Sequence, residues 1–429
     1  MKTSFAILGL VASACLSSHA EWPEFRGPTL DGHAPKDAKF PTEWSEEKNV
    51  TWKTPLHGKG WATPVVWGDQ IWLTTATDDG KQQSAICVDK NSGKILFDEI
   101  LFENAEPRPL SNNRNTYASP SPVIEDGRVY VHFGSYGTAC LDTKTFETLW
   151  ERTDFECHHW RGPASSPVSY GDLLILTFDG ADHQYLAAVD KKTGETVWKQ
   201  KRSTDYRDLD AKGHVKAEGD FRKAYNTPVF IDFGGTTQMI SPGAKAAWSY
   251  DPLTGKENWS LHWNEHSTAS RTVFSEELGL MFFNTGYGKS QLWAVKIDPT
   301  AKGELDESLI AWKQTKRMPN RCSPILADGQ LYVLSDQGVA TCLDAETGEE
   351  VWSERISEIP FSASIFYGGG LLYFFDEAGK GIVVKPGDTF ELVAENELAS
   401  GMFASPGADG NALILRTTTD LYRIEAPGS

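Results

Sequence analysis

An eleven-residue pattern that recurs along the chain constrains its fold more than any other feature of the sequence. It starts with a small residue and has Asp third, Thr-Gly sixth and seventh, and Trp eleventh. The full pattern stands at 188–198 and at 342–352, and Ser opens a third full copy at 249–259. The copy at 140–150 has Phe for the glycine, and the copy at 87–97 has Ser and Phe for the Thr and Trp. Such a repeat predicts one structural unit used many times.

The residues of this pattern have separate physical roles. An aspartate at a turn accepts hydrogen bonds from backbone N–H groups two residues further on, and glycine adopts a left-handed conformation at little cost. A tryptophan at the end of the unit buries roughly 150–250 Å² between neighbouring sheets. At about 25 cal/mol per Å² this contributes several kcal/mol per repeat as an upper bound. We therefore expect each copy to dock one unit onto the next.

Each copy of the pattern closes a unit of four strands. The unit begins with a short strand in which a small residue precedes proline, as at 62–66 and 322–326. A Gly-Asp or Asp-Gly turn follows, as at 68–69, and then a run of alternating apolar and polar residues, as at 128–132. This turn chemistry and a period of two predict antiparallel hairpins. A third strand then leads into the Asp turn, and a fourth carries the Trp.

The aromatic position of the fourth strand gives the number of units. Eight positions occur, the last of them degenerate: Trp52, Phe97, Trp150, Trp198, Trp259, Trp312, Trp352 and Val393. Residues 403–424 supply three further strands, and 50–55 supplies the missing fourth. Closing a ring with strands from both ends of the chain removes exposed sheet edges. The sequence therefore predicts an all-β fold, an eight-bladed propeller over residues 50–429 with four-stranded antiparallel blades.

The two segments before residue 50 have different characters. Residues 1–20 start with Lys2, continue with an apolar run and end in Ser-His-Ala, which predicts a cleaved signal peptide. We expect a periplasmic or secreted protein. The alternative is a lipobox ending at Cys15, whose acylation would make the protein a membrane-anchored lipoprotein. Residues 21–49 are rich in Pro and Gly without a clear period, which indicates an extended leader lying over the propeller.

The net charge of the chain limits the classes of partner, and the positions of its cysteines indicate whether they form disulfides. The net charge of -18 argues against a nucleic-acid partner, since phosphate binding needs a basic surface. An exported protein meets conditions in which disulfides form. Three of the cysteines, however, stand at the first position of the repeat, where other copies have Ala or Ser: Cys87, Cys140 and Cys342. We interpret these as small buried residues.

The repeat at 188–198 resembles the tryptophan-docking repeat of the quinoprotein alcohol dehydrogenase-like superfamily. That superfamily includes the pyrroloquinoline quinone (PQQ) dehydrogenases and the non-catalytic propeller lipoprotein of outer-membrane β-barrel assembly. The stretches 22–28 and 50–55 also resemble PQQ-like repeat proteins of planctomycetes and verrucomicrobia. The resemblance implies the propeller fold and admits PQQ as a cofactor.

The chain lacks the marks of the quinone enzymes in this superfamily. No two cysteines are adjacent, no stretch corresponds to the calcium ligands or the catalytic Asp, and no haem-attachment C-x-x-C-H occurs. The cofactor therefore stays open, with PQQ possible in principle, and no catalytic residue is assigned. We expect no metal site, because adjacent His158 and His159 on a strand would point apart.

The segments that precede each inner strand are the best candidates for a functional site. In a propeller these segments surround one mouth of the central channel. Here they carry Arg, His, Asn and aromatic side chains, which suit an anionic or sugar-like ligand. The candidate residues are Trp61, Arg114, Asn115, Tyr117, His158, His159, Arg161, Tyr225, Asn226, His266, Arg271, Asn320 and Arg321.

Three functions are compatible with this sequence. The first is a binding or assembly scaffold that holds a protein partner or a small ligand at the channel mouth. The second is a PQQ-dependent dehydrogenase of alcohols or sugars. The third, a hydrolase or lyase acting on carbohydrate at the His and Arg mouth, rests only on the composition of these loops.

Overall fold

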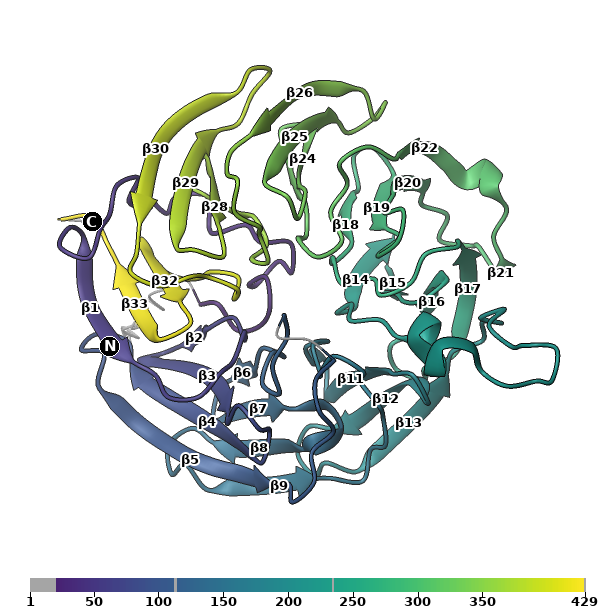
Figure 1. Cartoon of the computed structure of the whole chain (residues 1–429), viewed down its shortest axis with the longest axis horizontal. Coiled ribbons are helices and arrows are strands. Elements are labelled where there is room, and N and C mark those ends of the chain that lie inside the picture. Colours follow the sequence, from purple (N-terminus) through teal and green to yellow (C-terminus); the bar gives the residue numbers. More distant parts are fainter. Residues whose placement is uncertain (1–20, 112–113, 234, 428–429) are drawn as a thin grey trace, which may run out of the picture.

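Eight β-sheets form a closed ring in the computed structural model, which describes residues 21–111, 114–233 and 235–427 (Figure 1). Blade 1 consists of β2 (Val65–Trp67), β3 (Gln70–Ala76), β4 (Gln82–Asp89) and β5 (Ile95–Glu103), and blade 2 of β6 (Val123–Glu125), β7 (Arg128–His132), β8 (Thr138–Asp142) and β9 (Thr148–Arg152). Blade 3 consists of β10 (Val168–Tyr170), β11 (Leu173–Asp179), β12 (Gln184–Asp190) and β13 (Thr196–Lys201). Blade 4 consists of β14 (Val229–Phe233), β15 (Thr236–Pro242), β16 (Ala246–Tyr250) and β17 (Glu257–His262). Each blade runs outward from a short inner strand.

Blades 5 to 8 repeat the same order, and the last one takes its outer strand from the start of the ring. Blade 5 consists of β18 (Val273–Ser275), β19 (Leu280–Asn284), β20 (Leu292–Lys296) and β22 (Ile310–Gln314), and blade 6 of β23 (Ile325–Ala327), β24 (Gln330–Leu334), β25 (Val339–Asp344) and β26 (Glu350–Arg355). Blade 7 consists of β27 (Phe366–Gly368), β28 (Leu371–Phe375), β29 (Lys380–Lys385) and β30 (Glu391–Glu397). Blade 8 consists of β31 (Gly407–Asp409), β32 (Ala412–Arg416), β33 (Asp420–Ile424) and β1 (Val50–Pro55). The predicted eight-bladed fold is confirmed.

Ring closure takes place where β1 pairs with β33. The two strands are antiparallel, and Lys53 lies opposite Tyr422 in their register. Because β1 comes from the beginning of the ring and β33 from its end, this sheet joins the two ends of the propeller. Closure of this kind leaves the last blade without an unpaired edge.

The Asp turn and the Trp form the predicted contact between neighbouring blades. Asp190 Oδ1 accepts the backbone N–H of Thr193 at 2.9 Å, and Gly194 takes a left-handed φ of 73°. Trp150, from the blade before, donates its Nε1 to the carbonyl of Lys191 at 3.0 Å. Three further tryptophans donate Nε1 in the same way to the carbonyl of the residue that follows the Asp position. The pairs are Trp52 with Lys90, Trp198 with Pro252 and Trp312 with Ala345.

The hydroxyl before the inner-strand proline has a role that the sequence patterns did not indicate. The backbone N–H of Ser121 donates to Ser166 Oγ in the next blade at 2.9 Å, and Ser166 N–H donates to Thr227 Oγ1 at 2.9 Å. The series also runs from Thr63 to Ser121, from Arg271 to Ser323, from Ser323 to Ser364 and from Ser364 to Ser405, although Ser364 precedes Ile365 and not a proline. These bonds join consecutive blades around the axis.

Middle strands are buried on both faces because each blade packs between two others. All seven residues of β11 are buried, whereas the outer strand β13 alternates between exposed and half-buried positions. The spaces between blades are filled by separate apolar clusters rather than one core. Each interface between two blades therefore has its own apolar core.

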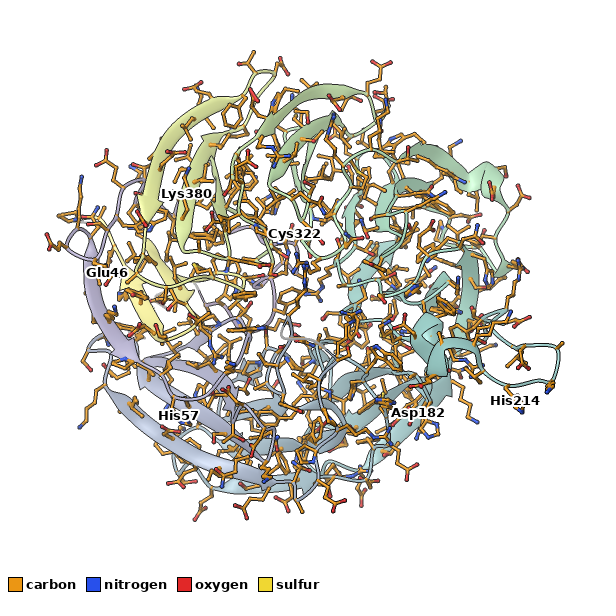
Figure 2. All side chains as sticks on the ribbon, viewed as in Figure 1. Glu46, His57, Asp182, His214, Cys322 and Lys380 are labelled. Carbon is orange, nitrogen blue, oxygen red and sulfur yellow. The ribbon has the colours of Figure 1, made fainter. Side chains whose placement is uncertain are left out.

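Two segments depart from the repeat. Residues 204–223 form an insertion that contains the 3₁₀ segment η2 (Lys216–Arg222), and its tip at His214 projects from the ring (Figure 2). The long turn of blade 5 contains β21 (Gly303–Glu304) and the 3₁₀ turn η3 (Glu307–Leu309), and β21 pairs in parallel with β17. A further 3₁₀ turn, η1 (Gly134–Tyr136), lies in blade 2.

Cysteines within the described residues are buried and unpaired. They are Cys87, Cys140, Cys157, Cys322 and Cys342. Cys322, which lies toward the centre of the ring in Figure 2, forms no disulfide with Cys342 of the same blade. The apolar environment raises the pKa of the Cys342 thiol to about 12. Within these same ranges no helix has both the length and the apolar character needed to cross a bilayer.

Candidate functional site

The leader before the ring lies across the axis of the propeller. Trp22 exchanges two backbone hydrogen bonds with Val66 of blade 1, at 3.0 and 2.8 Å, and is almost fully buried. The carbonyl of Pro23 accepts the N–H of Ile124 in blade 2 at 2.9 Å. The purple trace of the leader accordingly reaches the middle of the ring (Figure 1). These contacts fix the leader against inner strands of two blades.

Two buried arginines extend this anchoring to the other side of the ring. Arg271 Nη1 donates to the carbonyl of Phe25 at 2.6 Å, and its Nη2 donates to that of Pro228 at 2.6 Å. Arg26, in a left-handed conformation with φ 70°, donates to the carbonyls of Ile365 and Pro324, both at 2.8 Å. Arg271, a candidate ligand residue from the sequence, is therefore bound to backbone carbonyls within the chain.

Glu24 places a carboxyl group in the same interior. Its Oε2 is buried and has no hydrogen-bond partner among the described residues. Burial raises the pKa of Glu24 to about 7, and the charges of Arg271 and Lys191 oppose that rise. Burial likewise lowers the pKa of Arg271 to about 10. Docking of the leader is thus linked to the protonation of one carboxyl group.

The segments that precede the inner strands carry the predicted residues, and several of these residues hold loops in place. Asn115 Nδ2 donates to the carbonyls of Gly162 and Pro163 at 3.1 and 3.2 Å. Tyr117 is buried and donates its hydroxyl to the carbonyl of Arg108 at 2.9 Å. These side chains hold loop backbone. Arg114 is exposed.

The adjacent histidines serve different contacts. His159 Nε2 accepts the backbone N–H of Ser135 at 3.0 Å, and its Nδ1 lies 3.6 Å from Cys157 Sγ. Burial lowers the pKa of His159 to about 4, so the ring is neutral at pH 7. The backbone N–H of His158 donates to Asp182 Oδ1 at 2.6 Å. Among the described residues, no group of three His, Cys, Asp or Glu side chains could hold a metal ion.

Asn320 and Arg321 belong to an ion-pair network between blades 6 and 7. Arg321 Nε lies 3.2 Å from Asp336 Oδ2, and its Nη1 lies 3.1 Å from Glu377 Oε1. Asn320 Nδ2 donates to the same Asp336 oxygen at 3.0 Å. Asn226 is fully buried and donates to the carbonyl of Ser270 at 2.5 Å. These three side chains stabilise the blades that they join.

A second group of predicted residues lies together around Arg161. This half-buried arginine makes no side-chain hydrogen bond or ion pair to any residue that the structure describes. Its charge acts on Lys223, Tyr225 and His266. Lys223 is nearly fully buried and pairs with Asp220. The structure thus brings Arg161, Tyr225 and His266 together at the mouth.

Aromatic rings surround this group. The Lys223 ammonium lies 5.7 Å from the centre of the Trp160 ring, and the His266 ring lies 6.0 Å from that of Tyr287. Burial lowers the pKa of His266 to about 4. Trp61, also predicted for the mouth, stacks on Phe403 with 4.5 Å between the ring centres, in a separate place between blades 1 and 8.

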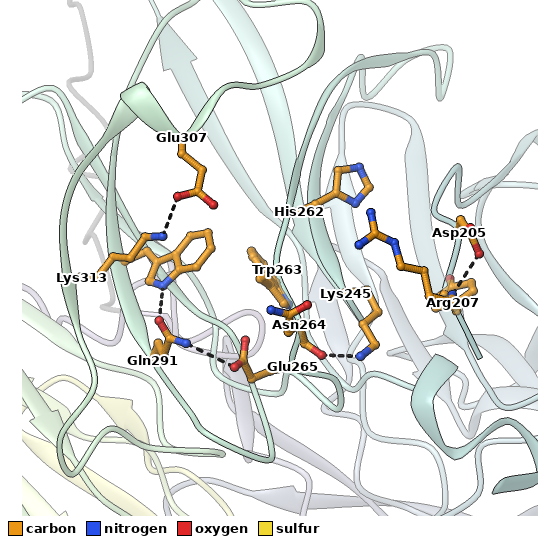
Figure 3. Close-up of a pocket in the computed structure, with 12 residues that line it drawn as sticks. Asp205, Arg207, Lys245, His262, Trp263, Asn264, Glu265, Gln291, Glu307 and Lys313 are labelled. Carbon is orange, nitrogen blue, oxygen red and sulfur yellow. Dashed lines mark hydrogen bonds and ion pairs between the residues drawn. The ribbon is translucent and has the colours of Figure 1, made fainter. Parts of the chain in front are cut away.

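Two cavities open near this face. One of about 600 Å³ is lined by Asn115, Tyr117 and residues of blade 1 such as Lys59. The other, of about 450 Å³, lies between blades 4 and 5 beside the insertion at 204–223 (Figure 3). None of the residues predicted for the site lines the second cavity. Its walls come from five separate segments, which sequence periodicity does not relate.

The fold and the face just described define a propeller of the PQQ-like repeat class. The family model described as outer membrane protein assembly factor BamB matches residues 44–218 and 248–401. The chain belongs to this family.

Solved structures share the fold at low identity. A europium-containing methanol dehydrogenase has a TM-score of 0.66 at 11% identity, over 94% of this chain and 89% of that one. BamB from Moraxella catarrhalis has a TM-score of 0.58 at 11% identity, over 87% and 99%. The quinohemoprotein alcohol dehydrogenase from Comamonas testosteroni has 0.66 at 11%, over 96% and 81%. No curated protein sequence matches the chain.

The residues at the axis do not fit PQQ together with a calcium ion. Arg26 and Arg271 are bound to backbone carbonyls, and Arg416 donates to the carbonyl of Thr74 at 2.5 Å. The leader backbone from Trp22 to Phe25 is bound to the inner strands of blades 1 and 2 and to Arg271.

Proposed function

We propose that this chain is an exported binding propeller, which holds an acidic segment of a protein partner or a small anionic ligand at the channel mouth. The observation that carries the proposal is the half-buried guanidinium of Arg161, which has no ionic partner among the described residues. Guanidinium groups bind carboxylates through paired hydrogen bonds. Arg161 is thus available to a carboxylate supplied from outside the chain.

The surroundings of Arg161 support the same assignment. The ammonium of Lys223, which pairs with Asp220, lies beside Arg161, whereas the chain as a whole carries a net charge of -18. A basic region on an acidic protein attracts the acidic part of a partner and repels its other surfaces. Tyr287, which is 59% exposed and lies next to the His266 ring, provides an aromatic contact at the edge of this region.

Family membership supports binding as the activity. The family model carries the description of an outer membrane protein assembly factor, and residues from both halves of this chain match it. Scaffolds act through surface contacts, and function in a shared fold follows from the residues of the site. Arg271 at the axis already donates to the leader, so ligand binding is assigned to the mouth and not to the axis.

A binding titration with an acidic probe tests this proposal. Residues 21–429 would be titrated with a fluorescent hexaglutamate peptide at low ionic strength. We expect binding that weakens with added salt, and an affinity reduced about tenfold by Arg161→Gln, since a hydrogen bond to a charged group is worth about 1.5–3 kcal/mol. The control is Arg355→Gln, which removes an exposed arginine on the outer strand β26. Equal affinities of Arg161→Gln and the unchanged protein would refute the proposal.

Dehydrogenation by a bound quinone is the competing function, and it is tested separately. The protein would be incubated with PQQ and calcium, and then with alcohols and aldoses in the presence of a dye acceptor. Our proposal predicts neither PQQ binding nor substrate-dependent dye reduction. Turnover that is proportional to protein concentration would establish the enzyme instead.

Export is the part of the proposal that concerns residues outside the described ranges. The predicted signal peptide at 1–20 and the alternative acylation site at Cys15 both lie there. We propose cleavage after Ala20 and a periplasmic or secreted product. Mass spectrometry of the protein from its native host checks this: an N-terminal Glu21 agrees, and a lipid-modified Cys15 at the N-terminus contradicts it.

A further inference from the structure

The cavity between blades 4 and 5 contains two buried polar atoms that lack partners. Trp263 and Glu265 are 7% and 8% exposed, and both line the cavity. Among the described residues, neither Trp263 Nε1 nor Glu265 Oε2 has a hydrogen-bond partner. A buried donor or acceptor without a partner costs about 1–3 kcal/mol. An indole N–H donor and a carboxylate oxygen acceptor are therefore unpaired at one site, and a ligand that both accepts and donates hydrogen bonds would pair them.

The carboxylate is held in position by a chain of hydrogen bonds. Trp293 Nε1 donates to Gln291 Oε1 at 2.9 Å, and Gln291 Nε2 donates to Glu265 Oε1 at 3.2 Å (Figure 3). The backbone is fixed as well, because Lys245 accepts from Trp263 N–H and donates to the Glu265 carbonyl, at 2.9 and 3.0 Å. One carboxylate oxygen is thus bound and oriented, which leaves the other for the ligand.

The charges around the cavity oppose an ionic ligand. Three basic side chains and three acidic ones line it: Arg207, Lys245, Lys313, Asp205, Glu265 and Glu307. Glu307 pairs with Lys313 at 3.1 Å. A cation would satisfy Glu265 and leave the Trp263 N–H without an acceptor, and an anion would do the reverse. A hydroxyl group accepts and donates at once, so a neutral polyhydroxylated ligand satisfies both atoms.

We propose that this cavity is a binding site for a neutral saccharide. Its volume of about 450 Å³ is within the range of about 300–1,000 Å³ that small-molecule sites occupy. Binding requires a small side-chain movement that opens these two buried atoms to the cavity; Trp263 Nε1 then donates to one sugar hydroxyl, and Glu265 Oε2 accepts from the same or a neighbouring one. Arg161, Tyr225 and His266 do not line this cavity, and the proposal is independent of the function proposed for the mouth.

The sequence gives a reason for the position of this site. The insertion at 204–223 contributes Asp205, Tyr206 and Arg207 to one wall, and the long turn of blade 5 contributes Glu307. Both segments depart from the repeat, and both lie at the same pair of blades. The two irregular segments therefore form part of the cavity wall together.

Isothermal titration calorimetry on residues 21–429 tests the proposal. The probes are glucose, galactose, xylose, N-acetylglucosamine, maltose and cellobiose. We expect at least one of these sugars to bind, and Trp263→Phe and Glu265→Gln each to weaken it about tenfold or more, the equivalent of one lost hydrogen bond. Trp263→Phe retains an aromatic ring and Glu265→Gln retains the shape of the side chain. Glu277→Gln, an exposed position beyond the cavity, is the matched control.

Thermal unfolding provides the second readout. A bound sugar stabilises only protein that can bind it, so the active sugar should raise the Tm of the unchanged protein and of Glu277→Gln but not of the two site variants. Three results would overturn the proposal: no sugar of the panel binds at about 10 mM, the site variants bind as well as the unchanged protein, or trialanine binds in a Trp263-dependent manner while the sugars do not.

Discussion

Arg271 and Phe25 are 246 positions apart in the chain, and the guanidinium of Arg271 donates to the Phe25 carbonyl at 2.6 Å. The same guanidinium binds the carbonyl of Pro228 through two nitrogens, at 3.1 and 2.6 Å. One side chain therefore connects the leader with the inner ends of blades 4 and 5. Arg271 is only 1% exposed, so these bonds lie in the interior of the molecule.

Arg271→Ala is expected to release the leader and destabilise the ring. It leaves two buried carbonyls without donors, at about 1–3 kcal/mol each. We expect a lower midpoint of urea unfolding and faster proteolysis within residues 21–30. Arg207→Ala, an exposed arginine, serves as the control and should change neither. A leader that is equally protected in Arg271→Ala would show that other contacts suffice.

Glu24 should make the protein less stable as the pH rises, which is the reverse of the usual effect of a carboxylate. Its folded pKa of about 7 lies above the ordinary value of 4.5, so the folded state binds the proton more tightly. This contribution is complete below pH 4.5 and is lost as the pH rises through 7. It amounts to about 2 kcal/mol between pH 5.5 and pH 8. Glu24→Gln should abolish that part of the dependence, measured by urea unfolding at both pH values; an unchanged dependence would contradict the assignment.

Gly194 should tolerate alanine much less well than Gly171. A Cβ at Gly194 would lie 2.7 Å from Cδ2 of Trp150, whereas one at Gly171 would meet nothing within 4 Å. Both glycines have positive φ, 73° and 56°, so backbone strain of about 1 kcal/mol is common to both. We expect Gly194→Ala to lower the Tm further by displacing Trp150, an overpacking cost of about 1–3 kcal/mol. Equal Tm values would count against tight docking of the tryptophan.

The hydroxyl of Ser166 should contribute more to stability than that of Thr272. Ser166 Oγ accepts the buried N–H of Ser121 at 2.9 Å, and Ser166→Ala leaves that N–H unpaired at about 1–3 kcal/mol. In blade 5 the corresponding place is held by Arg271, and the next residue, Thr272, has a buried Oγ1 without a partner among the described residues. Thr272→Val should therefore be nearly neutral. The free energies of unfolding in urea compare the two, and similar losses would remove the hydroxyl series as an account of blade assembly.

Most of the fold was predictable because it rests on a repeated local signal. The Asp turn, the glycine and the terminal aromatic each act within eleven residues, and their recurrence gives the number of blades. Even the copy with Phe146 in place of glycine forms the turn, with φ at 62°. The serine hydroxyls of the inner strands were present in the same repeats, but their bonds run between blades and follow no local period.

The site was predictable only in part, for a physical reason. The segments before the inner strands lie at the channel mouth, as propeller geometry requires. The sequence does not show which of their polar side chains already have hydrogen-bond or ionic partners within the chain. Asn115 and Arg321 have such partners, whereas Arg161 has none among the described residues. The cavity of Trp263 and Glu265 was not predicted at all, because both occupy ordinary loop positions in the sequence.

Site-specific photo-cross-linking in the native host tests the central claim, that the mouth holds a protein partner or ligand, most directly. A benzophenone amino acid would replace Tyr287, which is 59% exposed at the mouth, or Leu253, which is 58% exposed in the Asp turn at the other end of its blade. The account predicts a discrete cross-linked partner from position 287, absent from position 253 and lost when Arg161→Gln is added. Identical cross-linking from both positions, or a product at 287 that persists with Arg161→Gln, would contradict it.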